Sequence, residues 1–487
     1  MRTQLPVLLA VFALASAAQT PQKVIDNYLA AEGGAKALAR IHTATIDGSL
    51  TEESTGQSGS YSLIIKAPDR FYSEIIAGPD RAVEAFNGMS AWGQASPEGA
   101  RTLTGEAAAQ AEAAGRYWNS RLVDLKKNKL SVQFLGATTV GGRNANHLQV
   151  LLGAGITREV FFDAQTHLIL REVTPVEQID YDDYRAVEGI PMPYHLEIRH
   201  GSQQYQVAVT RIAFNSAVED SVFDFPREER TPLPDMKELI LELTRNQKAI
   251  DELQKQYTCH LTTEEMKTDS KSRTTSRTTK EFEVFNIAGE EARHLIAKDG
   301  EPLTGSAKQK EDDRFNKEFA RLTKKEADPN EVKKQAKEEA KEEAQISDFL
   351  RTVRFGNARR ERFRGQDVIA IDFGPNPDYK PKKTIENIIY RLSGVIWIDE
   401  QARDVARLEA HFNSAAKIGG GVVASIEKGS SFVFEQAKVN DEVWLPTYDE
   451  IHLGGRLLVL KFKANQVDRY TDWKKFRAES KIITAQE

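Results

Sequence analysis

The chain has 487 residues, with 66 basic and 72 acidic side chains and a formal net charge of −6. Because this length exceeds the size at which a single core keeps growing, it predicts two domains. The balanced charge, without a strongly basic domain, argues against nucleic acid as a partner.

The first residues have the three parts of a secretory signal peptide. Arg2 gives a positive start, residues 7–15 are apolar but too few to span a bilayer, and Ala15–Ala18 is a run of small residues. We expect residues 1–18 to be removed by cleavage after Ala17 or Ala18; a mildly apolar N-terminal helix is the alternative. Since no later apolar run approaches ~20 residues, we predict a secreted, periplasmic protein without a transmembrane segment.

Cys259 is the only cysteine, so no intrachain disulfide is possible. Its neighbour His260 raises the question of a metal or a nucleophile, but no second pair of ligands stands at a usable spacing. We therefore expect a partly buried thiol, with no metal and no cofactor.

The predicted mature chain opens with a helix. Thr20 is a suitable N-cap and Pro21 suits the first helical position, while Val24, Ile25 and Tyr28 fall on one face. Glycines at 33 and 34 interrupt this helix.

Residues 41–225 are predicted to be mostly strands, with one helical interruption at 105–125. Asn87-Gly88 lies between two strand-like runs and predicts a type I′ hairpin turn. Consecutive strands without long crossovers indicate an antiparallel sheet. The expected strands cover 61–66, 81–86, 91–94, 147–151, 159–162, 168–173, 194–199 and 205–212.

A proline-rich stretch, PREERTPLP at 226–234, is the best domain boundary. After it, Asp235 and Glu238 have capping-box spacing and open an amphipathic helix that runs to Gln256. The predicted domains are therefore a signal peptide at 1–18, a first module at 19–229 and a second module at 230–487.

The two modules share several phrases. REVFFDAQTHLILREV at 158–173 resembles GVIWIDEQARDVARLEAHF at 394–412, and the interval from Asp163 to Arg171 equals that from Asp399 to Arg407. Asp299-Gly300 also predicts a hairpin where Asn87-Gly88 predicts one in the first module. These matches indicate a tandem duplication of a module with one helix followed by strands.

The segment from Lys308 to Gln345 has no matching text in the first module and is highly charged. Its Glu–Lys spacings support an exposed helix that is polar on all sides. We expect a solvated helical arm, and an arm that contacts another protein is the alternative.

The repeated phrase of the second module predicts a β-hairpin. If Asp399 pairs with Asp404, strict alternation places Trp397 opposite Ala406 and makes one face buried. Small residues beside Trp397 suit either an open groove for a ligand or a packed core. The proposed ligand-binding face consists of Val395, Trp397, Ala406, Leu408, Ala410 and Phe412. Applied to the first module, the same register pairs Glu159 with Glu172 on the face that should be buried, so there it is doubtful.

The phrases VIWIDEQARDVARLE and EVFFDAQTHLILRE resemble the strand, Asp turn and Arg strand of the LolA/LolB-like outer-membrane lipoprotein-sorting proteins, as do VIDNYLAAEGGAKALARIHT and AFNGMSAWG. The resemblance covers most of residues 20–225 and, more loosely, 350–478. It implies an α+β fold of two tandem curved antiparallel sheets, or half-barrels, each with helices over its concave face. It also implies an acyl chain, a lipid or a lipidated protein as the ligand.

Sequence motifs of common enzymes are absent, including G-x-S-x-G, H-E-x-x-H and the Walker loop. The function that we expect is therefore a non-enzymatic, periplasmic binding protein for an apolar ligand. An envelope scaffold or stress-sensing protein that acts through protein contacts is the alternative.

Overall fold

A computed structural model of the chain describes residues 20–153, 155–226, 232–254, 256–268, 274–287, 290–326, 348–418, 424–457 and 460–475. The predicted signal peptide at 1–18 lies outside these residues. The chain divides into two compact units, one formed by residues up to Val83 with Ala109–Glu219, the other by Glu84–Ala108 with the residues from Asp220 on. These units interleave along the chain, so they do not test the predicted bounds of the two modules, 19–229 and 230–487. Those bounds remain a prediction.

The first sheet is antiparallel and has 13 strands in the order β6-β5-β4-β3-β2-β1-β13-β12-β11-β10-β9-β8-β7. Its helices are α1 (Pro21–Ala31), α2 (Ala35–Leu38) and α3 (Gly105–Ser120), and a short 3₁₀ helix covers Asp220–Phe223. The strands are β1 (Thr43–Glu52), β2 (Ser58–Lys66), β3 (Arg70–Ala77), β4 (Asp80–Phe86), β5 (Ala91–Ala95), β6 (Arg101–Thr102), β7 (Ser131–Val140), β8 (Arg143–Gly153), β9 (Ile156–Asp163), β10 (Ile169–Val173), β11 (Glu177–Val187), β12 (Ile190–His200) and β13 (Gln203–Phe214).

The second sheet repeats this plan, with a main path β17-β16-β15-β14-β26-β25-β24-β21-β20-β19-β18. Its helices are α4 (Met236–Gln254), α5 (Gly305–Glu326) and α7 (Thr384–Ile389). The strands are β14 (Tyr257–Thr268), β15 (Thr274–Ile287), β16 (Glu290–Lys298), β17 (Glu301–Pro302), β18 (Val353–Phe363), β19 (Gln366–Pro375), β20 (Leu392–Asp399), β21 (Val405–Phe412), β22 (Ala416–Ile418), β23 (Ala424–Ile426), β24 (Ser431–Val439), β25 (Val443–Leu457) and β26 (Leu460–Lys475).

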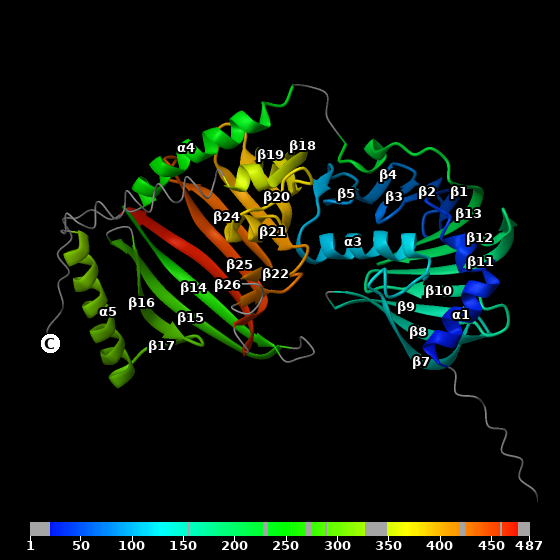
Figure 1. The fold of residues 1–487 in the computed structure, drawn as a ribbon, viewed down its shortest axis with the longest axis horizontal. Coiled ribbons are helices and arrows are strands. Elements are labelled where there is room, and N and C mark those ends of the chain that lie inside the picture. The colour runs from blue at the N-terminus through cyan, green and yellow to red at the C-terminus, as the bar shows by residue number, and fades with distance from the viewer. Residues whose placement is uncertain are drawn as a thin grey trace, which may run out of the picture. The chain divides into compact units, whose positions relative to one another are not determined.

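The strand order confirms the predicted fold class. In each sheet the strand after the first long helix pairs with the last strand, and the remaining strands follow as a meander. Neither order closes on itself, and Figure 1 shows both sheets as curved, open surfaces. The fold is therefore α+β with two tandem antiparallel sheets, while the duplication itself stays a prediction.

The helix α1 begins and ends as predicted. The Thr20 side chain accepts a hydrogen bond from the Lys23 backbone N–H at 3.2 Å, and Pro21 takes the first helical position. Gly33 and Gly34 follow it with φ angles of 87° and 100°, which side chains with a Cβ rarely adopt.

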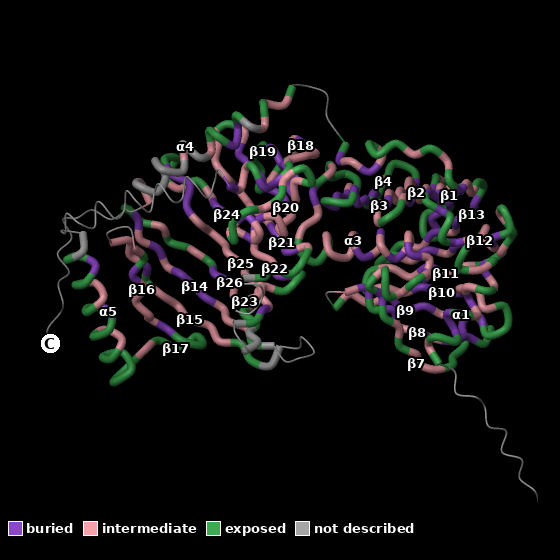
Figure 2. Tube along the Cα trace, in the orientation of Figure 1, coloured by how far each residue is buried: buried purple, intermediate pink, exposed green. Residues whose placement is uncertain are grey.

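Each sheet has an inner face, defined here as the face on which the first long helix of its unit packs. In the first unit α1 and α3 supply Val24, Ile25, Tyr28, Ala113 and Tyr117 to a core with strands β8 and β9. In the second unit α4 and α7 cover strands β18 to β21 in the same way. Buried residues gather where these helices lie on the strands (Figure 2).

The charged segment at 308–345 differs from its prediction. Its first part belongs to α5, which follows β17 as α3 follows β6, and both helices begin at a glycine of the repeated triplet Leu-Thr-Gly, Gly105 and Gly305. Phe315 and Leu322 of α5 are 8 % and 0 % exposed and pack on β15 and β16. The prediction of a helix polar on all sides is thus wrong for residues 308–326, and residues 327–345 lie outside the described part of the chain.

One of the two predicted type I′ turns is confirmed. Asp299 and Gly300 join β16 to β17 with φ angles of 53° and 83°, as a type I′ turn requires. At Asn87-Gly88 the predicted hairpin forms between the neighbouring strands β4 and β5, but its turn is not of type I′. Among these two residues only Gly88 has positive φ, and the Asn87 side chain instead accepts hydrogen bonds from the backbone N–H groups of Met89 and Ser90.

Candidate functional site

The repeated phrase forms the same turn in both units. The backbone N–H of Asp163 donates to Leu168 O at 2.8 Å, and that of Asp399 donates to Asp404 O at 2.9 Å. In each turn the aspartate Oδ1 also accepts two backbone N–H groups from the loop that follows. The aspartate is therefore repeated because its side chain closes the turn.

Both hairpins contain a β-bulge at the same place, which strict alternation does not predict. In the second unit Ile398 faces Val405 as predicted, but Trp397 faces Arg407, so Ala406 is the extra residue. In the first unit Leu170 is the extra residue, since Phe162 faces Ile169 and Phe161 faces Arg171. The predicted pairs Trp397–Ala406 and Glu159–Glu172 are thus wrong.

The bulge divides the predicted ligand-binding face between two surfaces. Val395, Trp397 and Ala406 belong to one core cluster, and Leu408 and Ala410 belong to another, on the inner face under α4. Phe412 pairs with Leu392, two positions from the pair of Gly394 with Ala410, so it also lies on the inner face. That these six residues bind a ligand stays a prediction, but they do not form one face.

Trp397 lies in a packed core. Its side chain is 3 % exposed, and its indole Nε1–H donates to a carboxylate oxygen of Glu361. The Arg407 guanidinium lies 5.6 Å from its ring centroid. The sequence left open whether Trp397 lines an open groove or a packed core, and in the structure it lies in a packed core.

The inner face of the second sheet continues beyond Leu408 as a straight row of side chains. Leu408 faces Phe434, which faces Asp449, which faces Asp468, which faces Thr263. Residues directly opposite in antiparallel strands project to the same face, so this row crosses β21, β24, β25, β26 and β14 on one surface. It changes along its length from apolar to acidic.

A second apolar row runs beside the first. Ala410 faces Phe432, and Phe432 faces Ile451. Phe432, Phe434 and Ile451 are all only partly buried. Figure 1 shows α4 along one end of the strands that carry these rows, where it contacts β25. This surface, here called the inner groove, is lined by Leu408, Phe432, Phe434, Ile451, Asp449, Asp468 and Thr263.

The helix α5 does not cover the inner groove, because it packs on the other face of its sheet from the face that α3 covers in the first unit. Tyr117 of α3 donates a hydrogen bond of 2.5 Å to Glu172, on the inner face of the first sheet. Phe315 of α5 instead packs on Phe285 of β15. Phe285 directly follows Val284, so the two side chains project to opposite faces of the sheet. Val284 faces Cys259 on the inner side.

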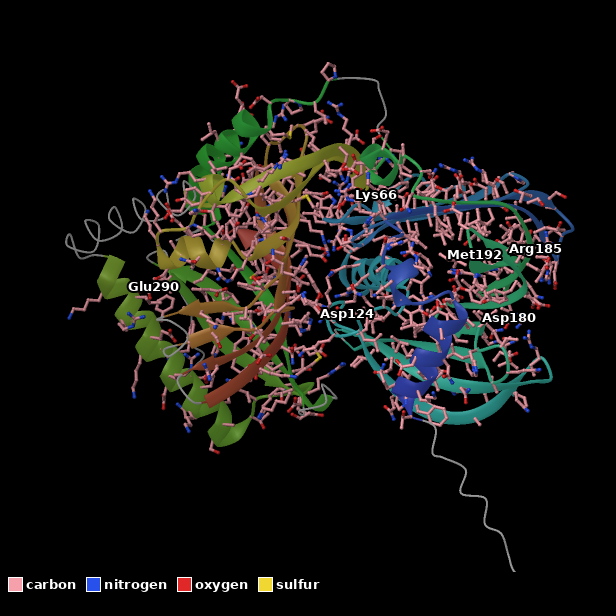
Figure 3. The ribbon with its side chains drawn as sticks, turned by 45° about the vertical axis from the view of Figure 1, so that its right-hand side comes forward. Lys66, Asp124, Asp180, Arg185, Met192 and Glu290 are labelled. Atoms are coloured by element: carbon pink, nitrogen blue, oxygen red, sulfur yellow. The ribbon has the colours of Figure 1, made fainter. Side chains whose placement is uncertain are left out.

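The first unit carries a buried polar network at the matching place on its inner face. Glu172 accepts from Arg158 at 2.6 Å and from Tyr181 at 3.2 Å. The hairpin registers match Arg158 with Gly394 and Glu172 with Leu408, so these polar positions are apolar or empty in the second unit. On the first sheet Arg171 binds Asp180 by two hydrogen bonds, and Figure 3 labels Asp180 on β11.

The described residues include no group of three or more His, Cys, Asp or Glu side chains placed to hold a metal ion. Cys259 is buried, and burial raises the pKa of its thiol to about 12. Among the helices of the described residues, none is long and apolar enough to cross a membrane.

Sequence reasoning missed the inner groove. Phe432, Phe434 and Asp449 lie after the hairpin at 394–412, from which the ligand-binding face was predicted. The available signal was the run of three apolar residues, Phe432, Val433 and Phe434, because such a run marks a strand with apolar side chains on both faces.

Comparison with known proteins gives matches among solved structures only. The chain resembles a DUF1329 family protein from Desulfovibrio piger (12 % identity, TM-score 0.30) and a LolA superfamily protein from Nitrosomonas europaea (10 % identity, TM-score 0.30). In both cases 42 % of this chain and 98 % of the other are covered. The MucA/MucB complex structure from Pseudomonas aeruginosa is matched over 93 % of this chain and 99 % of that chain, at 10 % identity and a TM-score of 0.17.

No family model matches the chain, and no curated protein matches it. The structural comparison includes proteins of the LolA superfamily, the group that the repeated phrases resemble. TM-scores this low do not carry the fold assignment, which rests on the strand order described above.

Proposed function

We propose that the protein is a non-enzymatic binding protein, secreted into the periplasm, that holds an apolar ligand in the inner groove. The ligand is an acyl chain of a lipid or of a lipidated protein. The observation that supports this function is the pair of apolar rows at Leu408, Phe434, Phe432 and Ile451, which stay only partly buried although Leu408 and Phe432 border the core under α4. Each CH₂ group buried there contributes about 0.8 kcal/mol.

Native mass spectrometry of the gently purified protein tests the proposal, together with titration of a fluorescent fatty acid. We expect co-purified lipid and saturable uptake, and Phe434→Ala should weaken uptake. The matched control is Phe161→Ala, which truncates a partly buried phenylalanine of the first unit that stacks on His147 at 4.1 Å. A clean mass with no fatty-acid uptake would contradict the proposal.

A second candidate function is an envelope scaffold or stress-sensing protein, and the outer face of α5 favours it. That face is exposed and carries Lys310, Lys317 and Lys324, while Phe315 and Leu322 fix the helix to the sheet. Pull-down from envelope extracts with Lys310→Glu/Lys317→Glu tests this role. Unchanged partner recovery would remove α5 from the interaction.

A further inference from the structure

We propose that the acidic end of the inner groove binds a primary ammonium group, so that the ligand is an amphiphile with an ammonium head and an apolar chain. Asp449, Asp468 and Thr263 hold the ammonium. This inference rests on the proposed function, because the alkyl chain of the same ligand lies on the apolar part of the inner groove.

The three residues are direct neighbours on one face. Asp449 of β25 faces Asp468 of β26, and Asp468 faces Thr263 of β14. Adjacent strands are about 4.8 Å apart, so the three residues span about 10 Å, and an ammonium group above the central Asp468 lies between Asp449 and Thr263 with three N–H donors to share among them.

Each of the three side chains has an oxygen that is buried and unsatisfied. The atoms Asp449 Oδ1, Asp468 Oδ1 and Thr263 Oγ1 find no hydrogen-bond partner within the described chain. Asp468 and Thr263 are only 5 % and 3 % exposed, so water does not solvate these oxygens freely. A buried acceptor without a donor is costly, and a ligand that brings donors removes that cost.

The other oxygen of each carboxylate is already engaged, which orients the free one. Tyr470 donates to Asp449 Oδ2 at 3.0 Å, and Gln466 donates to Asp468 Oδ2 at 2.8 Å. Because these donors occupy the Oδ2 atoms, the Oδ1 atoms remain for a ligand.

The nearby cations of the protein make their hydrogen bonds to other carboxylates. Arg293 donates to Glu291 at 2.7 Å. Lys280, which faces Thr263 from β15, donates to Glu265 at 2.6 Å. Arg293 also attracts the two aspartates, but it is shared with Glu291, so three carboxylates and one guanidinium leave net negative charge on this face, which a ligand cation neutralises.

A primary ammonium fits better than other cations. It has three donors, matching the three acceptors, whereas a trimethylammonium group of the same charge has none. From Asp468 the row continues through Asp449 and Phe434 to Leu408, about 14 Å across three strand spacings. An alkyl chain attached to the ammonium can extend along this row.

The test is isothermal titration calorimetry of the full chain with decylammonium and decyltrimethylammonium, both below their micelle concentrations. We expect decylammonium to bind at least about tenfold more tightly, because charge-assisted hydrogen bonds distinguish the two ions. The same comparison with short-chain phosphatidylethanolamine and phosphatidylcholine identifies the source of the ammonium. A preference in both comparisons assigns a phospholipid head, and a preference for decylammonium alone assigns a simple amine.

The variants are Asp468→Asn and Thr263→Val, which keep the side-chain shapes. Both should reduce the preference for decylammonium over decyltrimethylammonium, Asp468→Asn more strongly because it also removes the charge. The matched control is Glu264→Gln, next to Thr263 but on the opposite face, where the carboxylate pairs with Arg277 at 2.7 Å. It should leave the preference unchanged.

Equal affinities of the wild type for the two ions would overturn the inference without any variant. So would an unchanged preference in a folded Asp468→Asn protein. If fatty acid and decyltrimethylammonium still bind in either case, the apolar groove stands and only the ammonium site fails. If no amphiphile binds, the proposed function fails as well.

Discussion

The carboxylate of Glu172 accepts a hydrogen bond of 2.6 Å from the guanidinium of Arg158, and both side chains are 5 % exposed. The Arg158 guanidinium also lies 4.5 Å from the ring centroid of Tyr117. The pair is thus enclosed between α3 and the inner face of the first sheet.

Removing one partner of this pair should be more damaging than replacing both. Glu172→Leu leaves a buried, unpaired guanidinium and should lower the free energy of unfolding by about 3–5 kcal/mol. Arg158→Met/Glu172→Leu should recover much of that loss, because Leu408 already occupies the matching position in the second unit. Urea denaturation of the wild type and both variants measures this, and a double variant no more stable than Glu172→Leu would contradict it.

Trp397→Ala should behave as a core truncation. Since Trp397 is 3 % exposed among Val395, Ala406 and Trp444, its loss should cost roughly 3–5 kcal/mol of stability. Fluorescent fatty-acid affinity should stay unchanged, because the indole lies on the opposite face from the inner groove. A small stability loss combined with altered lipid affinity would mean that the face assignment is wrong.

Ammonium binding should depend on pH through Asp449. Burial, together with repulsion from Asp468 and Glu291 and despite Arg293, raises the pKa of the Asp449 carboxyl to about 6. The affinity for decylammonium should therefore rise between pH 5 and pH 7.5, as this carboxyl ionises. The rise should be absent in Asp449→Asn, and titration calorimetry across this range is the measurement.

The same shift has a defined sign for stability. A carboxyl with a raised pKa binds its proton more tightly in the folded state, so its contribution to stability falls as the pH rises from about 4 to 6. Without ligand, Asp449→Asn should gain stability relative to wild type at pH 7.5 and lose that advantage near pH 4. Denaturation at both pH values checks the sign, and a gain confined to low pH would contradict it.

The helix α5 should contribute to folding as well as to the surface. Leu322→Ala removes a side chain that is 0 % exposed against Ala292 and should cost roughly 2–5 kcal/mol. Lys324→Ala, on the exposed face of the same helix, should change stability by less than about 0.5 kcal/mol. Equal effects of the two substitutions in thermal or urea unfolding would show that α5 does not hold to the sheet.

Local features of the chain were predictable from the sequence. Thr20-Pro21, the capping pair at Asp235 and the Asp299-Gly300 turn each depend on a few neighbouring residues with specific backbone needs. The Asp235 carboxylate does accept the Glu238 backbone N–H at 2.9 Å. Local chemistry therefore located the starts of α1 and α4 and one tight turn.

The candidate site was not predictable, for two physical reasons. One extra residue, Ala406, reverses the facing of every later residue in β21 relative to strict alternation, and no residue type marks it as a bulge. The row from Leu408 to Thr263 also depends on the registers of five strands that lie far apart in the sequence. Such long-range pairing follows from the whole sheet and not from any one segment.

The bulges at Leu170 and Ala406 make the two hairpins interchangeable as backbones. The two hairpins have the same turn hydrogen bond and a β-bulge at the same position. The four loop residues 164–167 and 400–403 should therefore be exchangeable between the units without shifting either strand register. The same backbone frame thus carries a buried ion pair in one unit and an aliphatic surface in the other. New side chains can accordingly be introduced on the inner face of either hairpin while its turn, bulge and strand register are kept.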